Sequence, residues 1–286
     1  MKDEARVGFT LTELLVVIAV IGLLGSIIFA TTRGAGEQGR IAKGLYFSQH
    51  LHNSLGSYLV GRWSFDESSG TTANDTSGWD NNGTFVSSPV WRCATADSNY
   101  TPSGQGCSLE FDGSDDYVSI PDSILGMDGD FTVELWLKPI TSPGSYKRFF
   151  TLIDGTNNLQ LTIYNGQLSW RFGNVANRTT ETIPVGSWSH FAFVRDVISG
   201  NNSMYINGIK TSDTVTGPTA NGNYSAIGGG YSDSYMFNGL IDEVRIYATS
   251  LTSAQIQSQY YAGLQNLLAK NRMTEQEYRD RLLAMR

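Results

Sequence analysis

The sequence predicts a mainly β protein, an antiparallel sandwich preceded by a long N-terminal helix and followed by short C-terminal helices. Three observations support this fold class. Residues 9–30 form an apolar run with one ionisable group, residues 62–247 alternate apolar and polar side chains with a period of two, and residues 252–277 contain two helix-capping motifs. Many short strands with no helices between them are typical of two packed antiparallel sheets.

The apolar run from residue 9 to residue 30 is long enough to cross a membrane. At about 1.5 Å per residue, a helix of this length matches a hydrocarbon core that needs about 20 residues. Its ionisable group is Glu13. A carboxylate in that core costs roughly 2.5–3.5 kcal/mol on insertion scales, so a residue kept at this cost is expected to have a function.

The residues on either side of this run's start resemble the signature of the type IV pilins and pseudopilins. A short polar leader ends at Gly8, Phe9 follows it, and Glu13 is the fifth residue after this junction. The resemblance implies that a prepilin peptidase cuts after Gly8 and methylates the new amine of Phe9. It also implies that Glu13 pairs with the Phe9 amine of a neighbouring subunit, and such pairing removes much of the cost of both charges in lipid.

The alternatives are an ordinary signal peptide and a plain membrane anchor. A signal peptide has a shorter apolar core and small residues before the cut, and Ile28 with Ala30 makes a poor site of that kind. A plain anchor needs neither Gly8–Phe9 nor Glu13. Charge leaves the orientation open because the leader is balanced and Arg33 follows the run directly. Placement of the C-terminal part outside the cytoplasm therefore comes from the resemblance.

Local pattern divides the chain into a leader (1–8), a transmembrane and filament-core helix (9–30), a glycine-rich neck with an amphipathic helix (31–60), the sandwich (61–250) and a helical tail (251–286). Each interior glycine weakens a helix by about 1 kcal/mol against alanine. Helical order is expected to return where Phe47, Leu51, Leu55 and Tyr58 form one stripe at helical spacing.

Two capping boxes predict the helices of the tail. Thr252 with Gln255, and Thr274 with Glu277, have the spacing at which side chain and backbone cap each other. The tail packs on the neck or contacts a neighbouring subunit, and the sequence does not decide between these two.

The sandwich contains two clear hairpins. Asn165-Gly166 and Asn207-Gly208 each separate two alternating segments, and Asn-Gly supplies the positive φ angles of a type I′ turn. Further strands are predicted at 108–111, 117–120, 131–138, 188–195 and 240–247.

Several segments of this region together resemble the laminin-G-like, or concanavalin-like, jelly roll. In the order of that family they are Trp63–Glu67, Asp75–Gly78, Leu109–Gly113 with Asp116–Val118, Phe131–Pro139, Trp188–Phe193, Tyr205–Gly208 and Phe237–Tyr247. The resemblance implies two packed antiparallel sheets, frequently glycan or protein binding, and often a structural calcium ion.

Composition limits the classes of function. The net charge is -7 and there is no basic run, so nucleic-acid binding has no electrostatic support. The two cysteines, Cys93 and Cys107, flank a polar loop. Outside the cytoplasm they are expected to form a disulfide that contributes roughly 3 kcal/mol. The alternative, a zinc site, has no nearby histidine to complete it.

Calcium needs several oxygen ligands on loops that can wrap the ion. Asp66 and Asp242 are the preferred candidates because they lie near opposite ends of the domain sequence, and such ends are often adjacent in space. The other oxygen donors on predicted turns or strand ends are Asp75, Asn82 and Asp112, with Asp115 and Asp116. The alternative is that these residues simply form turns.

Carbohydrate binding needs exposed aromatic rings with polar partners on loops. Trp79, Trp91, Tyr100, Tyr231 and Tyr235 lie in loops rich in Gly, Ser and Asn, and Trp79, Trp91, Tyr231 and Tyr235 are the preferred candidates. The alternative for each is that the ring anchors its own loop. The tryptophans that lie in predicted strands are expected to pack in the core.

The sequence favours a binding protein over an enzyme. Glucanases of this architecture use a Glu-x-Asp-x-x-Glu pattern, and retaining hydrolysis needs two carboxylates about 5–5.5 Å apart. The chain lacks this pattern, since Asp242 and Glu243 are adjacent and would face opposite ways on a regular strand.

We therefore predict a pilin-like subunit, minor or at the tip of a type IV pilus or related filament, whose head adheres to a glycan or surface protein. The alternatives are a pseudopilin of a type II secretion or DNA-uptake machine with a structural head and, less favoured, a surface glycoside hydrolase. The expected partners are prepilin peptidase and other pilin subunits, bound through the N-terminal helix. The expected location is the cytoplasmic membrane as a single-pass precursor, then the extracellular filament.

Overall fold

The computed structural model describes residues 55–286, except 95–100, 104, 123, 125, 127, 142–143, 154–157, 174, 212, 216–224, 230–234, 272 and 285–286. The chain separates into two units, 1–47 and 48–286, and the second is described here. The leader, the predicted helix over residues 9–30, and the residues Gly8, Phe9 and Glu13 lie outside the described residues. Within the described part, no helix combines the length and the hydropathy needed to cross a bilayer.

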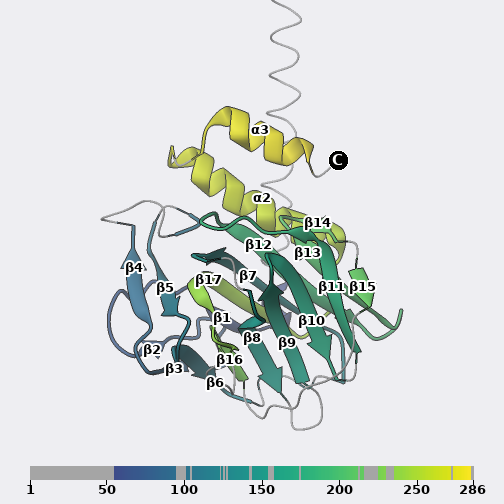
Figure 1. Ribbon diagram of the computed structural model, residues 1–286, viewed down its shortest axis with the longest axis horizontal. Helices are drawn as coiled ribbons and strands as arrows, with labels where there is room; N and C mark the ends of the chain where they lie inside the picture. Colours follow the sequence, from purple (N-terminus) through teal and green to yellow (C-terminus); the bar gives the residue numbers. More distant parts are fainter. Residues whose placement is uncertain are drawn as a thin grey trace, which may run out of the picture. The chain divides into compact units, whose positions relative to one another are not determined.

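Two antiparallel sheets form the domain (Figure 1). Sheet A consists, in spatial order, of β14 (Ile209–Lys210), β13 (Asn201–Ile206), β12 (Ser189–Asp196), β7 (Phe131–Pro139), β17 (Asn238–Tyr247), β5 (Cys107–Asp112) and β4 (Val90–Cys93), with β1 (Leu59–Trp63) paired to β17. Sheet B consists of β15 (Asp213–Val215), β11 (Val175–Thr182), β10 (Gln167–Phe172), β9 (Asn158–Tyr164), β8 (Lys147–Ile153), β16 (Ser225–Ile227), β6 (Tyr117–Ile120), β3 (Gly83–Val86) and β2 (Thr72–Ala73). The predicted antiparallel sandwich is confirmed.

The core lies between the two sheets and follows the period-two pattern. On β7, Phe131, Val133 and Leu135 are fully buried in the main hydrophobic cluster, where they meet residues from sheet B such as Leu161 and Trp170. Successive side chains of a strand point to opposite faces, so each strand contributes every second residue to this core.

Both predicted Asn-Gly hairpins are present. Asn165 and Gly166 join β9 to β10 with φ angles of 50° and 76°, and Asn207 and Gly208 join β13 to β14 with 51° and 76°. Cys93 and Cys107 pair across β4 and β5 and form the expected disulfide.

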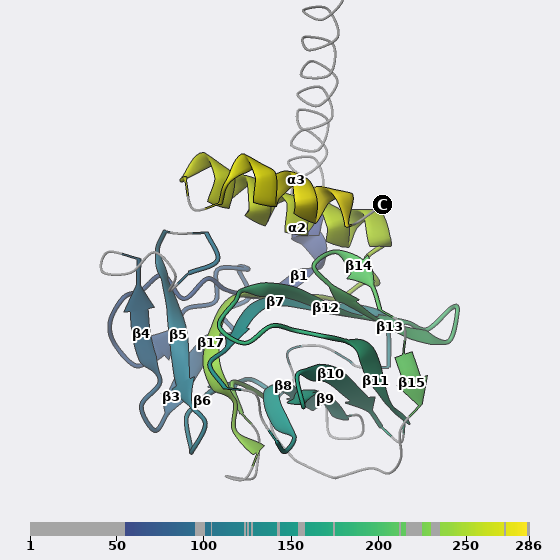
Figure 2. The same ribbon diagram turned by 45° about the horizontal axis from the view of Figure 1, so that its top comes forward.

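The C-terminal tail packs on the sandwich itself, and its contact with a neighbouring subunit stays a prediction. Helix α2 (Ser253–Ala269) lies over the outer face of sheet A, and α3 (Glu275–Leu283) lies beside α2 (Figure 2). Both capping boxes are formed. The ring of Tyr260 on α2 lies 5.7 Å from that of Trp136 and 5.9 Å from that of His190. As a result β7 is buried on both faces along its whole length.

The start of the domain contains only a short helical turn. Residues Gly56–Tyr58 form a single 3-10 turn, and β1 follows at once. Of the predicted amphipathic stripe, Leu55 is buried in a second cluster with Leu251 and Ile256, whereas Tyr58 is 48% exposed. The rest of that predicted helix lies outside the described residues.

Candidate functional site

The two preferred calcium ligands, Asp66 and Asp242, interact electrostatically where the first strand of the domain, β1, pairs with the last, β17. Asp66 follows β1, and its Oδ1 accepts a hydrogen bond from the backbone N–H of Cys107 at 3.0 Å. Asp242 lies in β17 and is only 3% exposed. Burial and then the neighbouring carboxylates of Glu243 and Asp66 raise the pKa of Asp242 well above its ordinary value. Three carboxylates therefore repel one another in a partly dry environment.

The backbone around this acidic group departs from regular structure. Glu243 has a φ of 49°, and the pairing of β17 with β7 is interrupted between Asp242 and Arg245. The expectation that Asp242 and Glu243 face opposite ways assumed a regular strand, and the bulge interrupts the regular alternation at these two residues. Phe65, just before Asp66, also has a positive φ of 53°. Positive φ is rare for such residues and marks positions held by their surroundings.

The chemistry of these donors fits a hard cation. Carboxylate oxygens are the ligands that calcium prefers, and a cation would offset the repulsion that, after burial, raises the pKa of Asp242. The carboxylate of Asp66 has room because residue 106 is glycine: a Cβ on Gly106 would lie 1.8 Å from Oδ1 of Asp66. Arg245 already neutralises part of the group through an ion pair with Glu243 at 2.6 Å.

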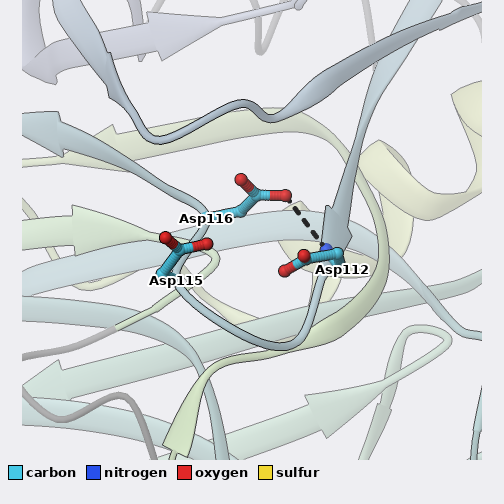
Figure 3. Close-up of side chains that lie close together, drawn as sticks. All are labelled: Asp112, Asp115 and Asp116. Carbon is cyan, nitrogen blue, oxygen red and sulfur yellow. Dashed lines mark hydrogen bonds between the residues drawn. The ribbon is translucent and has the colours of Figure 1, made fainter.

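A second acidic group lies in the turn between β5 and β6 (Figure 3). The carboxylates of Asp112, Asp115 and Asp116 lie within 4.8 Å of one another. Hydrogen bonds already occupy much of this group, as both oxygens of Asp116 accept backbone N–H groups, from Ser88 at 2.8 Å and from Asp112 at 3.2 Å. These bonds assign the cluster a role in shaping the turn.

The two remaining oxygen donors also shape a turn. Asp75 accepts hydrogen bonds at both oxygens, including those from the backbone of Arg62 and of Asn81. Asn82 accepts one from the backbone N–H of Asp75 at 2.8 Å. They therefore hold the turn between β2 and β3 in place.

The predicted ligand-binding aromatics fall into different environments. Trp79 is 64% exposed in the turn after β2. Trp91 packs against Phe85, with ring centroids 5.1 Å apart, and donates from Nε1 to the carbonyl of Gly70. Tyr235 is 37% exposed, and the guanidinium of Arg148 lies 4.7 Å from its ring centre. Tyr231 lies outside the described residues.

Tyr235 leads to a surface that the sequence alone did not reveal. On β9 and β10 the core takes Leu159, Leu161, Ile163, Leu168, Trp170 and Phe172. The alternate residues of these strands therefore form the outer face of sheet B. We name its aromatic and cationic members the tyrosine–arginine face: Tyr146, Arg148, Tyr164, Arg171, Arg178 and Tyr235.

Stacking orders this face. The rings of Tyr146 and Tyr164 stack with centroids 4.6 Å apart and planes 20° apart. The guanidinium of Arg178 lies 4.6 Å from the Tyr164 ring centre and donates to the Tyr146 hydroxyl. Cation–π contact of this kind fixes an arginine while leaving it charged.

Strand register places the cations in adjacent rows. One row of paired residues crosses β8, β9, β10 and β11 at Arg148, Thr162, Ser169 and Arg178. Arg171 lies in the next row, opposite Gln160. Neighbouring strands lie about 4.8 Å apart, so Arg148 and Arg178 are about 14 Å apart at the backbone. A search for cations at alternate positions of the predicted strands would have found this pattern, which a search of loops for aromatics missed.

Comparison with known proteins gives one family. A laminin-G-type family profile, described as the concanavalin A-like lectin/glucanases superfamily, matches residues 112–257. No curated protein sequence matches the chain. Among solved structures, the chain is similar to domain 4 of AbnA, a GH43 extracellular arabinanase from Geobacillus stearothermophilus, in complex with arabinotriose. The identity is 26% and the TM-score 0.51, over 70% of this chain and 97% of that one.

More distant structures show the fold alone. The binding domain of Paraclostridial Mosquitocidal Protein 1 is 16% identical with a TM-score of 0.55, over 73% of this chain and 53% of that one. A sialidase of Trypanosoma rangeli is 15% identical with a TM-score of 0.53, over 72% of this chain and 33% of that one. The matched part thus spans about half of the toxin domain and a third of the sialidase.

Proposed function

Since the chain belongs to the concanavalin A-like lectin/glucanases superfamily, we propose that it is a filament subunit whose domain binds a glycan and performs no catalysis. The observation that carries the binding role is the tyrosine–arginine face, where aromatic rings and hydrogen-bonding side chains share one surface of sheet B. Ligand sites of proteins combine aromatic walls with a few placed polar groups in this way. The similarity to a domain solved with arabinotriose supports the same role.

The filament role rests on the N-terminal sequence. Gly8, Phe9 and Glu13 stand in the spacing of a prepilin junction at the head of an apolar run. We propose that the precursor spans the cytoplasmic membrane, that cleavage after Gly8 releases the Phe9 amine, and that the run then packs among equivalent helices of other subunits. The domain is carried outside the cell, where a disulfide such as Cys93–Cys107 is stable.

The intact mass of the chain in sheared surface filaments tests this role. We expect a chain that begins at methylated Phe9, and we expect Glu13→Val to lower its amount in filaments by more than about tenfold. The reason is that the unpaired Phe9 amine then loses an interaction of the order of 2.5–3.5 kcal/mol. Thr12→Val, which removes a hydroxyl from the residue just before Glu13 without changing the charge, serves as the control. An uncut chain confined to membranes would contradict the proposal.

We further propose that Asp66 and Asp242 hold a structural calcium ion together with Glu243. Calcium added to chelator-treated protein is expected to raise the melting temperature by about 5–10 °C at a hundredfold excess over its dissociation constant, which corresponds to about 2.7 kcal/mol. Asp242→Asn should abolish this shift. Asp115→Asn, in the other acidic group, should leave it unchanged. Calorimetry in calcium and in chelator checks both variants. A shift in melting temperature that is lost only in Asp115→Asn would contradict the proposal and place the ion at Asp112, Asp115 and Asp116.

A further inference from the structure

We infer that the tyrosine–arginine face selects acidic glycans, whose sugars carry carboxylate or sulfate groups; this inference rests on the proposed glycan-binding function and names its ligand class. The first support is the distribution of charge. The chain has a net charge of -7, yet strands β8, β9 and β10 contain no Asp or Glu and carry Lys147, Arg148 and Arg171. Three adjacent strands of an acidic protein thus present only positive charge.

The second support is the geometry of the cations. Arg148, Arg171 and Arg178 lie in two neighbouring rows of one sheet face. Stacking on Tyr235 holds the first, and stacking on Tyr164 holds the third. A guanidinium held in place presents a planar fork that matches two oxygens of a carboxylate or sulfate. Rigid donors of this kind lose little side-chain freedom when a ligand binds.

The third support is that the same face suits a sugar ring. Tyr146 is 39% exposed and stacks on Tyr164, so its aromatic surface is accessible beside the arginines. Gln160 and Thr162 lie buried between the arginines, and the Thr162 hydroxyl is bonded to Ser169, so the accessible groups of this face are its rings and cations. Helices α2 and α3 lie over sheet A (Figure 2), and no helix in the described part of the chain covers this face. An accessible aromatic surface beside fixed cations matches an acidic sugar better than a neutral one.

Binding of the full-length chain in detergent micelles tests the inference. Dissociation constants would be measured for polygalacturonate, for dextran sulfate and for neutral arabinan. We expect at least one acidic polymer to bind about tenfold more tightly than arabinan, and its affinity to fall as salt is added. Arg148→Gln and Arg171→Gln should each weaken binding of the acidic polymer about tenfold and leave binding of arabinan unchanged.

Two matched variants control for charge and shape. Arg195 lies on β12 of sheet A, and its guanidinium stacks on Phe172, 4.2 Å from the ring centre. Arg195→Gln should change neither the affinity for the acidic polymer nor that for arabinan. Arg171→Lys keeps the charge without the fork and should retain part of the acidic affinity. Thermal unfolding of each variant confirms that the domain is folded.

The outcomes separate this inference from the proposed function. Equal affinity for arabinan and the acidic polymers, insensitive to Arg148→Gln and Arg171→Gln, would overturn the inference and leave the glycan-binding role standing. Binding to none of the three polymers would overturn the glycan-binding role itself. Equal binding to phosphatidylglycerol vesicles, lost in the same variants, would show a general anion-binding surface and would also overturn the inference.

Discussion

Replacing Glu134 with glutamine is expected to remove a loss of stability that the wild-type protein suffers as the pH rises from about 4.5 to about 8. Glu134 lies on β7 beneath the tail and is fully buried. Within the described residues, neither of its carboxylate oxygens has a hydrogen-bond partner. Burial raises the pKa of Glu134 to about 8, an effect that the nearby Arg245 only partly offsets.

The direction follows from proton binding. Between its ordinary pKa of 4.5 and the folded value of about 8, Glu134 keeps a proton in the folded state that the unfolded state releases. Folding then loses about 1.4 kcal/mol per pH unit, or about 5 kcal/mol across the window. Glutamine has the same shape and no titration. The free energy of unfolding of the wild type, relative to Glu134→Gln, should therefore fall by that amount over this range.

His190 should limit stability on the acid side. Burial and then Arg245 lower the pKa of His190 to about 3, so the unfolded chain binds a proton below about 6.5 that the folded chain refuses. Stability is lost as the pH falls from about 6.5 towards 3, and His190→Gln should remove this limb. Urea unfolding of the three proteins between pH 3 and 8.5 measures both effects. Parallel curves for wild type and Glu134→Gln from pH 4.5 to 8 would show that folded Glu134 is ionised.

Gly228→Ala is expected to lower the free energy of unfolding by about 2–5 kcal/mol. Gly228 has a φ of +85°, and a Cβ there would lie 2.2 Å from Cε1 of Phe111, whose ring is fully buried. The left-handed conformation costs an L-residue about 1–2 kcal/mol. The overpacked core adds about 1–3 kcal/mol because the ring can move only by disturbing its neighbours.

Gly70→Ala separates these two contributions. Gly70 has a nearly identical φ of +89°, and a Cβ there would meet nothing within 4 Å. It should therefore lose only the conformational part, about 1–2 kcal/mol. Chemical denaturation of both variants measures the difference. Equal losses would show that the Phe111 ring gives way without cost and that packing between the sheets is looser there than its burial indicates.

The sequence predicted the parts of the site that depend on residue type and position along the chain. Asp66 and Asp242 were chosen because the ends of a domain often meet; their carboxylates interact electrostatically, and calcium binding by the pair stays a prediction. The bulge at Glu243 was not expected, since a single residue with positive φ breaks the alternation on which strand patterns depend. The tyrosine–arginine face was also not expected, because its three arginines come from three strands, β8, β10 and β11, that only sheet register aligns.

The sequence by itself determined nine of the strands, the Asn-Gly hairpins, the helix caps and the membership of the sandwich class. These strands are β5, β6, β7, β9, β10, β12, β13, β14 and β17. These features depend on local spacing, which is visible in one stretch of chain. Only the tertiary structure decided what lies over each outer face. A period of two separates inward from outward residues but does not state whether an outward face meets water or another element. On sheet A, helix α2 buries Trp136 and His190. The outer side of sheet B bears the tyrosine–arginine face. The tail packs on sheet A because of side-chain contacts between segments distant in the sequence, and local pattern does not show such contacts.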